Sequence, residues 1–305
     1  MPNSRQLTRI ILVLGLCLVL GSLGFGAYYY SQRYMSPVKK VSPDDQALID
    51  LGNAVRKDPT DVQSRAKLAE TYLLNRRFDE AIAQSNKILE AYPENESAML
   101  TLGVAYIYTQ KFTQAIPPLE KFISIREKGQ MPNLDTSLES ALYFSGMAYI
   151  ETDQAEKGVT VLSRALGMNA TDADATYQLG RAYARSGKHE QAIHTFEIAT
   201  LFVPDYTAAY QGMLDSYLVL KDQTRASYAR GMVAYSIKDY QTATSELERV
   251  VLALPDFVPA YIGLGMSYEA LGDLDKAAQN AKKALELDPQ NPTAQRVADE
   301  IQSVK

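Results

Sequence analysis

Side chains of the kind that build catalytic and metal sites are scarce in this sequence. One cysteine, Cys17, and two histidines, His189 and His194, are all that its 305 residues contain. A single cysteine excludes a disulfide within the chain. The histidines are five residues apart, so they would not share one helix face, and no cluster of carboxylates accompanies them. No phosphate-binding loop, G-x-S-x-G or H-E-x-x-H motif occurs either. We therefore expect no catalytic residue, no cofactor and no metal.

Positive charge is also scarce beyond the first 43 residues. Five of the 31 basic residues precede residue 44, where no acidic residue occurs, which leaves 26 basic against 36 acidic residues and a net charge of −10. Neutralisation of phosphates supplies most of the non-specific affinity for nucleic acid. The balance of charge therefore excludes nucleic acid as an expected partner.

The chain has one long apolar run, at residues 10–27, which carries no charge and approaches the length of a bilayer span. Three tyrosines follow at residues 28–30, as in an interfacial belt, and Arg5 and Arg9 precede the run. We predict a short basic segment at 1–9, a transmembrane helix or signal anchor at 10–30 and a tether at 31–43. A cleavable signal peptide would have a shorter apolar region and a small-x-small exit, which residues 22–24 match poorly. Whether the segment is cleaved stays open.

Basic residues lie on both sides of the apolar run, so charge alone leaves the membrane orientation open. A short basic leader before a single span commonly inserts with its N-terminus in the cytoplasm. We expect a single-pass membrane protein with the rest of the chain outside the cytoplasm.

The rest of the chain repeats a pattern of small and aromatic residues with a period of 34. Frames begin at residues 62, 96, 139, 173, 207, 224 and 258. Small residues allow two antiparallel helices to approach, while a ring fills the space beside them. We predict structural roles for the glycines of the eighth position and the tyrosines of the eleventh: Gly103, Gly146, Gly180, Gly231, Gly265, Tyr72, Tyr106, Tyr149, Tyr183, Tyr217 and Tyr268.

The motif L-G-x-x-Y, followed by alanine and proline, is well preserved in Leu264, Gly265, Tyr268, Ala277 and Pro289. It resembles the signature of the tetratricopeptide repeat (TPR) family. The resemblance implies an all-α fold, a right-handed solenoid of helix–turn–helix units. We expect a capping half repeat at 44–61, the array at 62–291 with an insertion at 127–135, and a C-terminal capping helix at 292–305.

The frames at 207 and 224 are only 17 residues apart. We predict that the helix at 224–237 serves two repeat units, as the second helix of one and the first helix of the next. Arg230 then falls on a normally apolar position, so we expect it to be partly buried near Glu246 or Asp215.

In the TPR family, the first helices of successive repeats line a concave groove, and the fifth and ninth positions of each unit face it. This resemblance predicts a partner-binding groove rich in tyrosine and methionine, formed by Tyr143, Met147, Tyr177, Arg181, Tyr228, Met232 and Met266. Such a surface suits an extended peptide or a helix of another protein. The alternative is that these side chains pack on one another as core.

From these features we expect a membrane-anchored TPR scaffold or adaptor that binds a protein partner during assembly or maturation of a membrane-associated complex. One alternative is a structural or homo-oligomeric TPR protein. Another is a factor that resembles the anchored TPR proteins of cytochrome c maturation.

Overall fold

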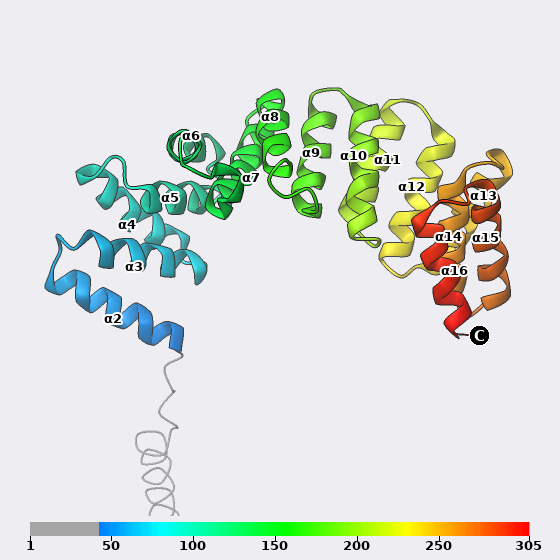
Figure 1. Cartoon of the computed structure of the whole chain (residues 1–305), viewed down its shortest axis with the longest axis horizontal. Coiled ribbons are helices and arrows are strands. Elements are labelled where there is room, and N and C mark those ends of the chain that lie inside the picture. Colours follow the sequence, from blue (N-terminus) through cyan, green and yellow to red (C-terminus); the bar gives the residue numbers. More distant parts are fainter. Residues whose placement is uncertain (1–42, 305) are drawn as a thin grey trace, which may run out of the picture. The chain divides into compact units, whose positions relative to one another are not determined.

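Fifteen α-helices and one short 3₁₀ helix make up residues 43–304, which are the residues that our computed structural model describes. No strand occurs among them (Figure 1). The chain divides into two compact units, Met1–Asn53 and Ala54–Lys305. The helices are α2 (Pro43–Lys57), α3 (Val62–Leu74), α4 (Phe78–Ala91), α5 (Glu96–Tyr108), α6 (Phe112–Arg126), η2 (Pro132–Leu134), α7 (Thr136–Glu151), α8 (Ala155–Leu166), α9 (Ala173–Arg185), α10 (His189–Phe202), α11 (Thr207–Val219), α12 (Gln223–Ser236), α13 (Tyr240–Ala253), α14 (Val258–Ala270), α15 (Leu274–Leu287) and α16 (Pro292–Val304).

Local sequence accounts for where many of these helices begin. The side chains of Asp61, Asn95 and Asp172 accept hydrogen bonds from backbone N–H groups in the first turns of α3, α5 and α9. Asp135 does the same for α7, which therefore begins at Thr136, three residues before the repeat frame at 139.

The turn inside each repeat contains one residue in the left-handed conformation. These residues occupy the fifteenth position of all seven frames: Arg76, Gln110, Asp153, Gly187, Lys221, Lys238 and Gly272. Only two of them are glycine, the residue that adopts this conformation without a steric cost. The turn therefore recurs even where its sequence does not favour it.

The glycines of the eighth position lie where two helices approach closely. A Cβ atom at Gly103 would lie 2.5 Å from Leu119 Cγ, and one at Gly180 would lie 2.5 Å from the ring of Phe196. A Cβ atom at Gly265 would have no neighbour closer than 3.3 Å. The column of small residues is thus a packing requirement, and its strictness varies along the chain.

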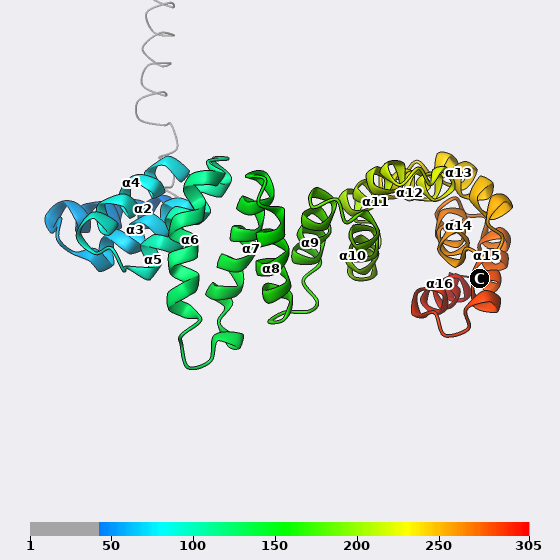
Figure 2. The same ribbon diagram turned by 90° about the horizontal axis from the view of Figure 1, so that it is seen from above.

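Alternate helices contact one another, and these contacts form two rows that follow one another along the chain. The odd-numbered helices from α3 to α11 form the first row, and α12, α14 and α16 form the second. Helix α12 packs against both α11 and α13. Figures 1 and 2 show α14, α15 and α16 grouped at the C-terminal end. Side chains at equivalent positions before and after α12 therefore belong to different surfaces.

Arg230, on α12, is half-exposed, and its Nη1 lies 3.5 Å from Oε2 of Glu246. Glu246 Oε1 also accepts a hydrogen bond of 3.1 Å from Arg249. The predicted carboxylate neighbour of Arg230 is therefore present, as an ion pair across α12 and α13.

The predicted transmembrane helix at 10–30 lies outside the described residues. Within residues 43–304, no helix combines the length and the hydropathy that crossing a bilayer requires.

Candidate functional site

Four of the seven predicted groove residues lie on the first row of helices and are partly exposed. They are Tyr143 and Met147 on α7, and Tyr177 and Arg181 on α9. We call the surface that they form, with the facing side of α11, the first groove.

Aromatic contacts hold the rings of the first groove in place. The ring of Tyr177 lies 5.8 Å from that of Phe196 and 5.1 Å from that of Tyr206. The Tyr206 hydroxyl donates a hydrogen bond of 2.6 Å to Asp174. Tyr143 meets Phe144 edge-on at 5.2 Å. The rings are therefore preorganised, which lowers the entropic cost of binding a partner.

A cavity of about 350 Å³ opens between α9 and α11 in the first groove. Tyr177, Phe196 and Gly212 line it, while Gln211 and Asp215 supply polar groups. Gln211 and Asp215 occupy the fifth and ninth positions of the frame at 207, which the resemblance assigns to the groove, whereas the repeat pattern did not single out Phe196 or Gly212. A usable signal was glycine at the sixth frame position, which occurs only at Gly212 and Gly263.

Arg181, one of the charged residues that line this cavity, is already held by neighbours. Arg181 donates from Nη1 to Gln178 over 2.8 Å, and its Nη2 forms an ion pair with Glu151. His189 also lines the cavity, and its buried Nδ1 has no hydrogen-bond partner among the described residues. The His, Cys, Asp and Glu side chains of residues 43–304 form no group of three that could hold a metal ion.

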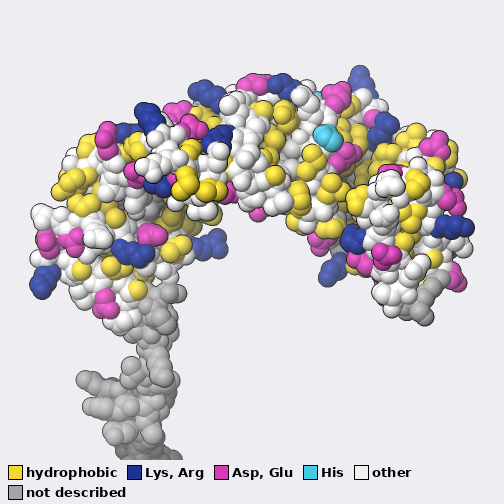
Figure 3. Space-filling model, viewed as in Figure 1, with side chains coloured by type: hydrophobic (Ala, Val, Ile, Leu, Met, Phe, Trp, Pro, Cys, Tyr) yellow, Lys and Arg dark blue, Asp and Glu magenta, His cyan; other side chains and the backbone are white. Residues whose placement is uncertain are grey.

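The other three predicted groove residues are buried, so the expectation that they are exposed in one continuous groove is wrong. Tyr228 is 7% exposed, Met232 3% and Met266 7%. The physical reason is the change of row at α12, where the ring of Tyr228 meets that of Phe257 edge-on at 5.1 Å and Met232 packs beside Gly263 of α14. All three line a second cavity, of about 360 Å³. Figure 3 shows hydrophobic side chains gathered around a hollow where α10 and α12 face α14 and α16.

The tyrosines of the eleventh position pack as structural residues to different degrees. Tyr149, Tyr217 and Tyr268 are buried, whereas Tyr72, Tyr106 and Tyr183 are only partly buried. The hydroxyl of Tyr149 donates to Glu120, and that of Tyr268 donates to Glu248. Burial and the adjacent carboxylate raise the pKa of Tyr149 to about 12. These two hydroxyls therefore link one repeat unit to the second helix of the preceding unit.

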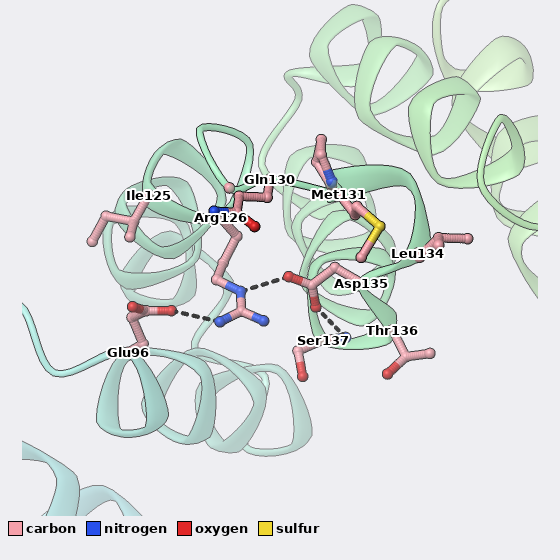
Figure 4. A pocket seen from close by; sticks show the side chains of 11 residues that line it. Glu96, Ile125, Arg126, Gln130, Met131, Leu134, Asp135, Thr136 and Ser137 are labelled. Carbon is pink, nitrogen blue, oxygen red and sulfur yellow. Dashed lines mark hydrogen bonds and ion pairs between the residues drawn. The ribbon is translucent and has the colours of Figure 1, made fainter.

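The insertion at 127–135 borders a polar cavity of about 540 Å³ (Figure 4). Arg126 crosses it, donating from Nε to Asp135 over 2.5 Å and from Nη1 to Glu96 over 3.0 Å. The hydrogen bond from Arg126 to Asp135 holds the pKa of Asp135 below its usual value. Met131 and Leu134 of the insertion are exposed. The ion pairs hold α5, α6 and the start of α7 together.

The chain is similar to known proteins that contain the same repeat. Three models described as tetratricopeptide repeat match residues 45–96, 148–216 and 258–291, which together make up about half of the chain. Heat shock protein STI1 of Saccharomyces cerevisiae is 31% identical over 104 residues, 34% of this chain and 18% of that protein. The peroxisomal targeting signal receptor of Candida albicans is 22% identical over 200 residues, 54% of this chain and 33% of the receptor. The chain therefore spans at most about a third of the length of these two relatives.

Among solved structures, the C-terminal part of a TPR repeat-containing protein from Cytophaga hutchinsonii is similar with a TM-score of 0.50 and 15% identity. The likeness covers 83% of this chain and 94% of that chain, and it shows the fold alone. With the repeated turn, the packed glycine column and the three matching segments, these comparisons show that the chain belongs to the tetratricopeptide repeat family, as an all-α solenoid.

Proposed function

We propose that this protein is a membrane-anchored TPR adaptor that binds an extended segment of a protein partner in the first groove and catalyses no reaction itself. The observation that carries the proposal is the cavity between α9 and α11, whose lining combines aromatic rings with polar side chains. Such a mixture buries apolar side chains of a peptide and offers partners to its backbone.

The geometry of the groove favours an extended segment over a bulky domain. Tyr143, Met147 and Tyr177 follow one another along α7 and α9, so they form a narrow stripe. Gln211 donates to Asp215 over 2.9 Å, which leaves its carbonyl oxygen to accept from a peptide N–H. One relative is a peroxisomal targeting signal receptor, which supports recognition of a polypeptide segment.

The membrane anchor is the second part of the proposal, and the apolar run at 10–27 supports it. We propose that the N-terminus lies in the cytoplasm and the TPR solenoid outside it, where the protein assists assembly or maturation of a membrane-associated complex. Full-length protein should sediment with membranes, resist carbonate extraction and keep its original N-terminus. Freely soluble protein that begins near Tyr28 would overturn this part.

The groove itself is tested by placing a charge on its apolar stripe. Met147→Asp should lower capture of a partner from solubilised membranes about tenfold, because a desolvated carboxylate on an apolar contact costs more than 1 kcal/mol. The matched control is Leu252→Asp on α13, since Leu252 is 85% exposed and lies outside both cavities. Equal loss in both variants, with unchanged helicity, would contradict the groove as the binding site.

A further inference from the structure

The second cavity belongs to a different surface from the first groove. It is lined by α10, Tyr210 of α11, α12, α14 and the first residues of α16, whereas the first groove is formed by α7, α9 and another face of α11. Its walls are apolar where Met232, Ile262 and Met266 meet. Gly263 exposes the backbone of α14 there, and a Cβ at this residue would lie 2.7 Å from the sulfur of Met232. About 360 Å³ is within the range of about 300–1,000 Å³ of ligand sites.

Two buried phenols beside this cavity differ in their hydrogen bonding. The hydroxyl of Tyr210 donates to the carbonyl oxygen of Pro204 over 3.0 Å. Tyr228 is only 7% exposed, and its hydroxyl forms no hydrogen bond with another of the described residues, but the oxygen itself stays accessible from the cavity. The hydroxyl of Tyr228 is therefore available to a polar group of a ligand that enters the cavity.

One carboxylate, that of Glu197 on α10, lines the same cavity. No lysine or arginine is among the lining residues, and His194 Nδ1 lies 3.8 Å from Glu197 Oε2 on a side chain that is 75% exposed. Arg225 acts on Glu197 only at a distance, because its Nη1 is held by Asp222 at 2.7 Å. Burial raises the pKa of Tyr228, and the hydroxyl of Tyr210 and the carboxylate of Glu197 raise it further, so Glu197 lies within electrostatic reach of Tyr228.

We propose that the second cavity binds a basic, apolar peptide segment of a partner protein. An apolar side chain enters between Met232 and Met266, and an adjacent ammonium or guanidinium donates hydrogen bonds to Glu197 and to the Tyr228 oxygen. The charge of the cavity favours a cation over an anion of the same shape. The site goes beyond the proposed function, because it lies on another row of helices and can be occupied while the first groove is filled.

The test follows the methionine methyl groups of the full-length chain in detergent micelles by NMR, after labelling all 9 methionines with ¹³C. The probes are two capped tripeptides, acetyl-Leu-Phe-Lys-amide and acetyl-Leu-Phe-Glu-amide. The lysine peptide should shift the resonances of Met232 and Met266 in a saturable manner, with a Kd about tenfold below that of the glutamate peptide.

Three variants separate the contributions. Glu197→Gln should bring the two Kd values to within about twofold, whereas Glu190→Gln, which removes an exposed carboxylate from the same helix, should preserve the tenfold preference. Tyr228→Phe keeps the buried ring and should weaken the lysine peptide about fivefold.

The proposal is overturned if neither peptide moves Met232 and Met266, if both bind equally, or if Glu197→Gln keeps the preference. Met147→Asp should leave the lysine peptide unaffected. Failure of the first groove and failure of this cavity are therefore distinguishable.

Discussion

The glycine column provides a prediction in which one substitution has opposite outcomes at equivalent positions. Gly180→Ala would place a Cβ 2.5 Å from Cε1 and 2.6 Å from Cδ1 of Phe196. The ring cannot withdraw easily, because Gly212 closes on it from α11, where an added Cβ would also lie 2.5 Å from the ring. Overpacking costs about 1–3 kcal/mol, and the higher helix propensity of alanine returns about 1 kcal/mol. Because the contact at 2.5 Å is severe, we expect a net destabilisation near the upper end of the difference, about 1–2 kcal/mol.

Gly265→Ala is the matched control at the same frame position. Its nearest neighbour would be Val297 Cγ1 at 3.3 Å, followed by backbone atoms of Ala277 and Ala281 at 3.6 and 3.7 Å. A small shift of α16 relieves the first contact, so we expect a change between zero and about 1 kcal/mol of stabilisation. Urea denaturation followed by circular dichroism at 222 nm compares the two variants. Equal destabilisation would refute the packing account, and a stabilised Gly180→Ala would refute it outright.

Further predictions concern the turns, a helix cap and the tyrosine column. Lys238→Gly should stabilise the protein by about 1 kcal/mol, because Lys238 adopts a φ of 67° that glycine reaches without strain; a lower melting temperature would contradict this. Asp135→Asn should cost about 1 kcal/mol at pH 7. Because Arg126 lowers the pKa of Asp135 in the folded state, this difference should be present above the unfolded-state pKa of about 3.9 and disappear as the pH falls further, as acid titrations of both proteins would show. Tyr149→Phe should cost about 1.5 kcal/mol through loss of the hydrogen bond to Glu120, with the urea midpoint as the measurement; an unchanged midpoint would place that hydroxyl in solvent.

The fold could be predicted from the sequence because its packing constraint recurs. Gly103 must be small because Leu119 approaches it, and the same steric condition returns at Gly146 against Leu162. The ion pair between Arg230 and Glu246 also follows from the half-period step, since a cation at an apolar position needs a nearby carboxylate.

The burial of Tyr228 could not be predicted in the same way. It has the same frame position as Tyr177, but a period in sequence does not say which helices face a given side chain. Tyr177 stays partly exposed beside a cavity, whereas Tyr228 is 7% exposed and its ring meets that of Phe257 edge-on at 5.1 Å. The contacts of α12 with two rows of helices decide the difference, and they depend on the fold as a whole.

The sequence contains only a weak signal of the two cavities. Gly212 and Gly263 are the only glycines at the sixth position of their frames, and each lines one cavity. The repeat explains glycine at the eighth position but not at the sixth, so these two residues mark local departures from it. The unpaired hydroxyl of Tyr228 has no such signal, because hydrogen bonding depends on neighbours that are distant in sequence.

Photo-crosslinking in native membranes tests the central claim, that the first groove holds a protein partner, most directly. A photoreactive phenylalanine analogue replaces Met147 or Gln211 in the groove, or Leu252 as the exposed control, in the full-length protein. We predict that illumination gives the same covalent adduct with a second protein from both groove positions and none from position 252. Adducts from position 252 alone, or adducts only with another copy of this chain, would contradict the account.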